Sequence, residues 1–90
     1  MSIVVLCAVA DPIRFRIMEE LADGARCVCD LQREIGCAPN LLSYHLRVLR
    51  EANLVAASRR GRWVDYRLVP SACAKLRGAL PRVCGMGTDR

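Results

Sequence analysis

Hydrophobic residues recur at helical spacing directly after a helix-start signal near the beginning of the chain. Asp11 is followed by Pro12, a combination typical of an N-cap and the first helical position. From Ile13 onward, apolar residues lie at helical intervals until Gly24 interrupts the pattern. The pattern predicts an amphipathic helix over about 12–23.

A shorter helical pattern follows Cys27 and stops at Gly36, and Asn40 is expected to cap a third helix. In that third helix the leucines share one face, and the opposite face carries Ser43, Tyr44, Arg47 and Arg50. Two short helices joined by a glycine-containing turn, the second with a cationic outer face, are typical of a helix-turn-helix.

A β-hairpin is predicted after this motif. Residues 54–59 and 62–69 are rich in β-forming residues, and they are joined through Arg60-Gly61. The tip of the hairpin carries three arginines, Arg59, Arg60 and Arg62. Six arginines against two carboxylates between Tyr44 and Arg67 place a net charge of +4 on the third helix and the hairpin. The predicted fold is therefore mostly α with a β-hairpin wing, a winged helix-turn-helix.

The two ends of the chain are apolar. Residues 3–9 are almost entirely hydrophobic, and residues 71–80 show a last helical pattern. A chain of 90 residues that is 53% hydrophobic has more apolar surface than a small monomer buries. We therefore expect a homodimer whose dimerisation segments lie at about 1–10 and 71–84.

The length of the chain indicates the number of domains, and the residues at its start indicate the cellular compartment. The length fits one domain, placed at 1–84, with a flexible tail at 85–90. The run 2–10 resembles the apolar part of a secretion signal, but it lacks a basic segment and a helix start follows at Asp11. We expect a cytoplasmic protein with reduced thiols, and a secreted disulfide-bonded protein is the alternative.

The charge of the chain indicates its partner. The net charge is +5, and 13 of the 14 basic residues are arginine, whose planar guanidinium binds phosphates and guanine edges. The isoelectric point is about 9.2. We expect double-stranded DNA as the partner and no membrane association, because no stretch approaches the roughly 18 apolar residues that a membrane span requires.

Cys27 and Cys29 form the strongest chemical signal in the sequence. They stand beside Arg26 at a predicted helix start, where the helix dipole favours thiolate, the form that binds soft metals. On a regular helix these two side chains point about 200° apart, so they can share one ion only if the turn is non-helical or opens. Ion binding should therefore strain the first helix of the helix-turn-helix. The alternative is that these cysteines pack in the core.

The remaining cysteines and the single histidine give weaker signals. Cys73 and Cys84 are about 16 Å apart along a helix, so they could share an ion only across a two-fold axis, and the alternative is that they are unrelated. Cys7 and Cys37 are expected to pack, although either could supply a third thiolate. His45 is expected to pack or to face DNA. With one histidine and no nucleophile–base pair, we expect no enzyme.

Four blocks in this order resemble the ArsR/SmtB metal-sensing repressors over about residues 8–70: Ala10–Ile17, Cys27–Leu31, Leu42–Ala52 and Gly61–Leu68. The resemblance implies a dimeric winged helix-turn-helix that occupies an operator in the metal-free state and dissociates when an inducer binds. The block Cys27-Val-Cys-Asp-Leu31 is similar to the metal box of arsenite- and cadmium/lead-responsive members, which implies a ligand role for Cys27 and Cys29.

The chain departs from the family pattern at three places. Gln32 stands where arsenite sensors often carry another cysteine, and Cys7 is the only cysteine in the N-terminal segment. Ser71 and Gly87 replace the carboxylates that zinc sensors place on the last helix. The last substitution favours an ion softer than zinc.

The sequence thus predicts a transcriptional repressor of a metalloid or heavy-metal resistance operon, induced by As(III), with Sb(III), Cd(II) or Pb(II) as alternatives and no organic cofactor. The predicted DNA contacts lie on the third helix and the wing: Asn40, Ser43, Tyr44, Arg47, Arg50, Arg59, Arg60 and Arg62. Two other functions remain open on the same residues, a metal-independent thiol redox switch and, more distantly, a small thiol enzyme.

Overall fold

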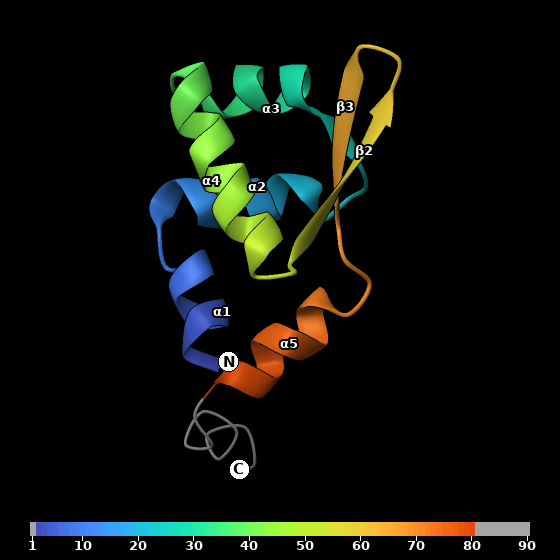
Figure 1. The fold of residues 1–90 in the computed structure, drawn as a ribbon. Coiled ribbons are helices and arrows are strands. Elements are labelled where there is room, and N and C mark those ends of the chain that lie inside the picture. Colours follow the sequence, from blue (N-terminus) through green and yellow to red (C-terminus); the bar gives the residue numbers. More distant parts are fainter. Residues whose placement is uncertain (1, 81–90) are drawn as a thin grey trace.

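The computed structural model describes residues 2–80, which form a winged helix-turn-helix (Figure 1). This confirms the predicted fold class. The elements within these residues, in chain order, are α1 (Ser2–Val9), α2 (Pro12–Leu21), β1 (Arg26–Cys27), α3 (Val28–Ile35), α4 (Pro39–Glu51), β2 (Val55–Arg60), β3 (Trp63–Leu68) and α5 (Ala72–Ala79). Cys84, the predicted tail at 85–90 and the end of the segment 71–84 lie outside the described residues.

Helix α2 begins where the sequence predicts. The carboxylate of Asp11 accepts hydrogen bonds from the backbone N–H groups of Ile13 at 2.9 Å and Arg14 at 3.1 Å. Pro12 occupies the first turn, where its missing N–H costs no hydrogen bond. The helix ends at Leu21, slightly before the predicted boundary.

Helices α3 and α4 form the helix-turn-helix, and one predicted cap is wrong. Gly36 ends α3 in the left-handed conformation with φ of 79°, as expected for a glycine at a helix C-terminus. Asn40, however, lies inside the first turn of α4 and caps nothing, because Ala38 is the N-cap residue and Pro39 follows it. The fixed φ of proline suits the first helical position, so Pro39 sets the start of this helix.

The wing is the predicted hairpin with its turn shifted by one residue. Arg60 pairs with Trp63 across the antiparallel strands β2 and β3, so the turn is Gly61-Arg62 and not Arg60-Gly61. Gly61 has φ of 58°, which a two-residue hairpin turn requires at this position. Strand β1, which was not predicted from the sequence, adds to the other edge of β3 and gives the strand order β1-β3-β2.

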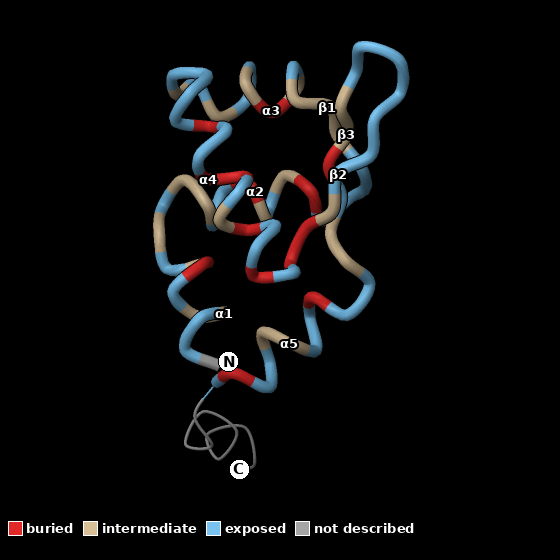
Figure 2. The backbone as a smooth tube through the Cα atoms, in the orientation of Figure 1, coloured by how far each residue is buried: buried red, intermediate tan, exposed pale blue. Residues whose placement is uncertain are grey.

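The core lies where α2, α3, α4 and the base of the strands meet (Figure 2). Leu42, Leu46 and Leu49 are almost completely buried, which confirms the predicted apolar face of α4. Helix α1 packs against α5, and these helices contribute Ala8 and Ala72 to the same core. Helix α1 was predicted as an apolar segment without a defined structure. None of the described helices has the length and apolar character needed to cross a membrane.

Candidate nucleic-acid interface and thiol site

The outer face of α4 is exposed and polar, as predicted. Ser43, Tyr44, Arg47 and Arg50 are all exposed, and Asn40 lies exposed at the start of the helix. The guanidinium of Arg47 lies 5.8 Å from the centroid of the Tyr44 ring, within the range of a cation–π contact. The face thus presents cationic and hydrogen-bonding groups on a helix whose other side is fixed in the core.

The three arginines at the tip of the wing differ in their surroundings. Arg59 and Arg62 are exposed, and neither has an ion-pair partner within residues 2–80. Arg60 donates from Nε to the carboxylate of Asp65 at 2.7 Å. This hydrogen bond, together with the charge of Asp65, raises the pKa of Arg60, and the nearby Cys27 acts in the same direction. Asp65 carries no local pattern in the sequence that predicts this contact.

Cys27 lies at the junction between a strand and a helix. Its backbone is extended, with φ of −78° and ψ of 159°, and its Sγ accepts a hydrogen bond from the N–H of Asp30 at 3.4 Å. Cys27 is therefore the side-chain N-cap of α3. Cys27 is half-buried, whereas Cys29 in the first turn of α3 is exposed. The pair thus begins outside the regular helix, which is one of the two conditions under which the two sulfurs could share an ion.

Charged groups of α3 and of the wing surround Cys27. In the antiparallel register Cys27 lies opposite Asp65 of β3, so their side chains project from the same face of the sheet. Asp30 has a lowered pKa, mainly because of its hydrogen bond with the Cys27 side chain and also because of Arg33 at 2.6 Å. Cys27 therefore contacts α3 and is paired with the strand that carries the wing.

The other cysteines lie elsewhere. Cys37 is half-buried and packs against the core, as expected, whereas Cys7 on α1 is exposed and does not pack as expected. Cys73 lies exposed on α5. Within residues 2–80 no group of three or more His, Cys, Asp or Glu side chains is arranged to hold a metal ion. In the described part of the chain, Cys27 and Cys29 therefore do not belong to a preformed cluster of three or more such side chains.

An apolar groove of about 390 Å³ lies between α1, α2 and α5. Its lining includes Leu6, Phe15, Met18, Cys73 and Leu76. Phe15 is 55% exposed, and Ile3, Val4 and Leu80 are also large exposed hydrophobic residues at this end of the molecule. The groove thus belongs to an unburied apolar surface formed by α2 together with the two segments predicted to dimerise.

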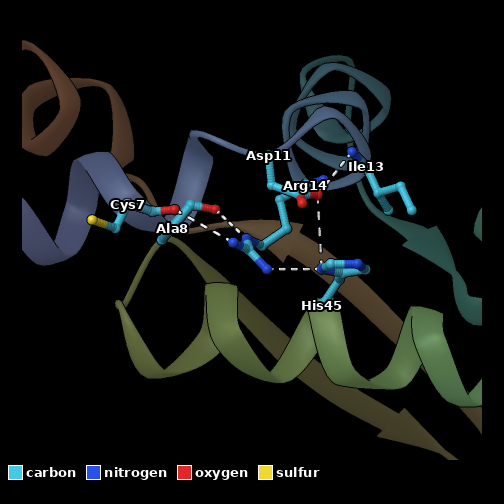
Figure 3. A network of polar contacts seen from close by, with 6 residues as sticks. All are labelled: Cys7, Ala8, Asp11, Ile13, Arg14 and His45. Atoms are coloured by element: carbon cyan, nitrogen blue, oxygen red, sulfur yellow. Dashed lines mark hydrogen bonds and ion pairs between the residues drawn. The ribbon is translucent and has the colours of Figure 1, made fainter.

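Figure 3 shows a polar network between α1, α2 and α4. Arg14 donates to the carbonyl oxygens of Ala8 at 2.6 Å and Cys7 at 3.4 Å, and its Nη1 lies 2.8 Å from Nδ1 of His45. His45 is 6% exposed, so it packs inside the protein, one of the two expected environments. Arg14 was not identified from the sequence, because the partners of its side chain lie on two other helices, α1 and α4.

The fold and the exposed cationic helix define a regulatory domain of the winged helix-turn-helix class. A family model described as bacterial regulatory protein, arsR family, matches residues 11–57. The chain belongs to this family, which confirms the resemblance seen in the sequence. Its relatives are transcriptional regulators, and this confirms the expectation that it is not an enzyme.

Several relatives and solved structures are similar to this chain. It is 44% identical over 62 residues to the arsenical resistance operon repressor of Bacillus subtilis, an alignment that covers 68% of this chain and 59% of the relative. It is 34% identical over 84 residues to the nodulation protein NolR of Rhizobium meliloti, covering 93% of this chain and 69% of the relative. The chain spans about half the length of several curated relatives that it matches.

The crystal structure of a possible transcriptional regulator for arsenical resistance superposes with a TM-score of 0.80 at 32% identity, covering 96% of this chain and 95% of that one. The transcriptional repressor BigR of Xylella fastidiosa superposes with a TM-score of 0.73 at 31% identity, covering 89% and 82%. These similarities extend over both the helix-turn-helix and the wing.

Proposed function

We propose that this chain is a dimeric transcriptional repressor of a metalloid or heavy-metal resistance operon, released from operator DNA when As(III) binds the thiolates of Cys27 and Cys29. The observation that carries the proposal is the position of Cys27. The side chain of Cys27 caps α3 and its backbone pairs with the wing strand opposite Asp65, so this one residue links both halves of the DNA-binding unit. Cys29, two residues further along the chain, is exposed.

The DNA contacts follow from the exposed surface. The N-terminal part of α4 would enter the major groove with Asn40, Ser43, Tyr44 and Arg47, while Arg50 would bind phosphate. Arg59, Arg60 and Arg62 would contact the backbone or the minor groove from the wing. The exposure of all these residues supports this arrangement.

Release would follow from a competition for the sulfur of Cys27. A thiolate that binds an ion no longer caps the helix, so the N–H of Asp30 loses its acceptor at the start of α3. Movement of Cys27 also strains its pairing with β3, and α3 itself packs against β3. A coupling free energy of about 1–3 kcal/mol, or about 5–150-fold in operator affinity, is the usual size of such an effect.

The proposal includes a homodimer formed by α1 and α5. The apolar groove and the exposed Phe15 lie at this end of the molecule. A second copy of the chain packed against them would remove this surface from water. A shared ion site of Cys73 and Cys84 across the dimer remains a prediction. A substitution of Phe15 by Asp should shift the protein from dimer to monomer in analytical ultracentrifugation, and an unchanged dimer would place the interface elsewhere.

The inducer is proposed from the thiol chemistry and the relatives. Thiolate ligands bind soft metal ions, and one relative is named as an arsenical resistance operon repressor. As(III) is therefore the proposed inducer, with Sb(III), Cd(II) or Pb(II) as alternatives. A cytoplasmic location, where thiols stay reduced, follows from the same proposal.

The test uses an operator selected from a random duplex library by the reduced full-length protein. Fluorescence anisotropy then measures binding while As(III), Sb(III), Cd(II), Pb(II) or Zn(II) is added. As(III) should release the wild type but not the variant with both Cys27→Ser and Cys29→Ser, which should bind the operator normally. Release of that variant by As(III) would contradict the proposal. Release by peroxide alone, with a loss of free thiols in mass spectrometry, would favour the redox switch instead.

A further inference from the structure

We infer that Arg14 and His45 are positioning residues that couple helix α1 to the DNA-reading side chains of α4. The inference rests on the proposed function to the extent that α4 is the helix that reads DNA. It goes beyond that function, because it assigns a route from the proposed dimer interface to the DNA that does not involve the thiols of Cys27 and Cys29.

The first step of the route is the contact between Arg14 and the end of α1. Carbonyl groups in the last turn of a helix have no partner within the helix, and they carry partial negative charge. Arg14 donates from Nε to the carbonyl of Ala8 at 2.6 Å and from Nη2 to that of Cys7 at 3.4 Å. Arg14 is therefore a cationic cap for α1, although it belongs to α2.

The second step is the bond from Arg14 to the DNA-binding helix. Nη1 of Arg14 lies 2.8 Å from Nδ1 of His45 on α4. A guanidinium has only donors, so Nδ1 is the acceptor in this contact. The carboxylate of Asp11 lies 3.9 Å from the same nitrogen. Asp11 fixes the start of α2 by accepting the N–H of Arg14 at 3.1 Å, so the backbone that carries the guanidinium is also held in place.

The third step leads from His45 to the surface of α4. The rings of Tyr44 and His45 meet edge to face, with centroids 5.1 Å apart and an interplanar angle of 63°. Arg47 in turn lies over the Tyr44 ring at 5.8 Å. Tyr44 and Arg47 are exposed and belong to the proposed major-groove contacts. The contacts thus run without a break from α1 to two side chains that would read bases.

Two observations favour a positioning role over simple burial of a polar group. Within residues 2–80, Arg14 is the only side chain whose hydrogen bonds join α1 to α4. All three nitrogens of its guanidinium are also used, because Nε, Nη1 and Nη2 each reach a different acceptor. A lysine has a single ammonium group and could not hold these three acceptors in the same arrangement.

The test compares Arg14→Lys with Arg16→Lys, a matched control on the same helix. The side chain of Arg16 is 47% exposed and pairs with Glu20. Within the described residues, none of its hydrogen bonds reaches α4. Both substitutions keep the charge, so binding to random DNA should stay the same. Arg14→Lys should lower the affinity for the selected operator by about tenfold, within the usual size of coupled contacts, while Arg16→Lys should not. An equal loss for operator and random DNA would overturn the inference.

A second pair of variants tests His45. Asn offers an acceptor near the position of Nδ1, whereas Leu fills the space without an acceptor. His45→Asn should therefore bind the operator better than His45→Leu, and equal affinities would contradict the positioning role. If Arg14→Lys does not fold, as judged by circular dichroism, this pair decides the question. Because both residues belong to one network, the double variant Arg14→Lys with His45→Leu should lose no more affinity for the operator than the more strongly affected single variant.

Hydrogen exchange without DNA separates the inference from the proposed function. Arg14→Lys should raise exchange in both α1 and α4, whereas Arg16→Lys should leave α4 unchanged. If the wild type selects no operator, the proposed function fails, while the exchange data still decide whether Arg14 couples the two helices. Unchanged exchange in α4 of Arg14→Lys would overturn the inference even if operator binding is specific.

Discussion

Two junctions lead into the helix-turn-helix, and each begins with a side-chain N-cap of different chemistry. At the start of α2 the carboxylate of Asp11 accepts two N–H groups, at 2.9 and 3.1 Å. At the start of α3 the sulfur of Cys27 accepts one N–H group, at 3.4 Å. Because sulfur is a weak acceptor, the second cap holds its helix less firmly than the first.

The surroundings of the two caps differ in the same sense. Beside Asp11, Arg14 and the buried His45 join three helices. Beside Cys27 lie an exposed Cys29 and the wing residue Asp65. A carboxylate cap of this kind maintains one arrangement of the helices. A thiol that caps a helix can instead bind a soft ion and give up its hydrogen bond with the helix. The junction at Asp11 therefore stabilises the arrangement of the helices. In the proposed function, the junction at Cys27 is the switch.

Replacing Cys27 by Ser should have the largest effect and would sharpen the comparison. Serine is a preferred N-cap residue, so α3 should remain capped and the free energy of unfolding should not fall. As(III) should no longer release this variant, so the change of about 5–150-fold in operator affinity should disappear. Cys73→Ser, which changes an exposed cysteine far from α3, is the control and should retain release. If Cys27→Ser responds normally, Cys27 is not a ligand.

Replacing Asp11 by Ala should have the next largest effect. Loss of this cap should lower the free energy of unfolding by about 1 kcal/mol, and the measurement is urea denaturation followed by circular dichroism. The change also frees the N–H of Arg14, so operator affinity should fall, while any release by As(III) should keep its fold-change. If the variant loses release but not stability, the assignment of roles to the two junctions is wrong.

Acid should weaken the Asp11 junction through titration of its carboxyl group. Hydrogen bonds, first of all from the N–H of Arg14, hold the pKa of Asp11 below its ordinary value of 3.8. The stabilisation is therefore complete above the ordinary value and is lost as the pH falls through the lowered folded value. Asp11→Asn should show a smaller loss of stability between about pH 6 and pH 3 than the wild type. Equal losses in the two proteins would show that this carboxyl does not contribute.

Capping residues, turn residues and the spacing of apolar positions predicted most elements of this fold. They failed where a segment does not alternate between polar and apolar residues. The start of α2, the end of α3 and the wing all carry turn or capping residues next to periodic apolar positions. Residues 2–9 are so uniformly apolar that helix α1 has no polar face to reveal it. Strand β1 contains two residues and exists only through its pairing with β3, so no pattern within it could have indicated a strand.

The same limit applies to the site. The exposed face of α4 could be predicted because it is the reverse of a leucine face with helical spacing. The bond between Arg14 and His45 joins residues 31 positions apart, and the pairing of Cys27 with Asp65 depends on the register of strands. Such contacts depend on tertiary packing, and a single sequence shows only the types of the residues involved.

The smallest predicted effect concerns Asp65, which lies beside the thiol junction and pairs with Arg60. Each phosphate contact contributes about 0.9 to the slope of log affinity against log salt concentration. Because Arg60 donates to Asp65 at 2.7 Å, it should contribute less than a full contact. Arg62, which has no ion-pair partner in the part of the chain that the structure describes, should contribute one. Arg62→Ala should therefore reduce the slope by about 0.9, and Arg60→Ala by less. Asp65→Asn should steepen the slope by freeing Arg60, and an unchanged slope would mean that Arg60 does not reach the DNA even when it is unpaired.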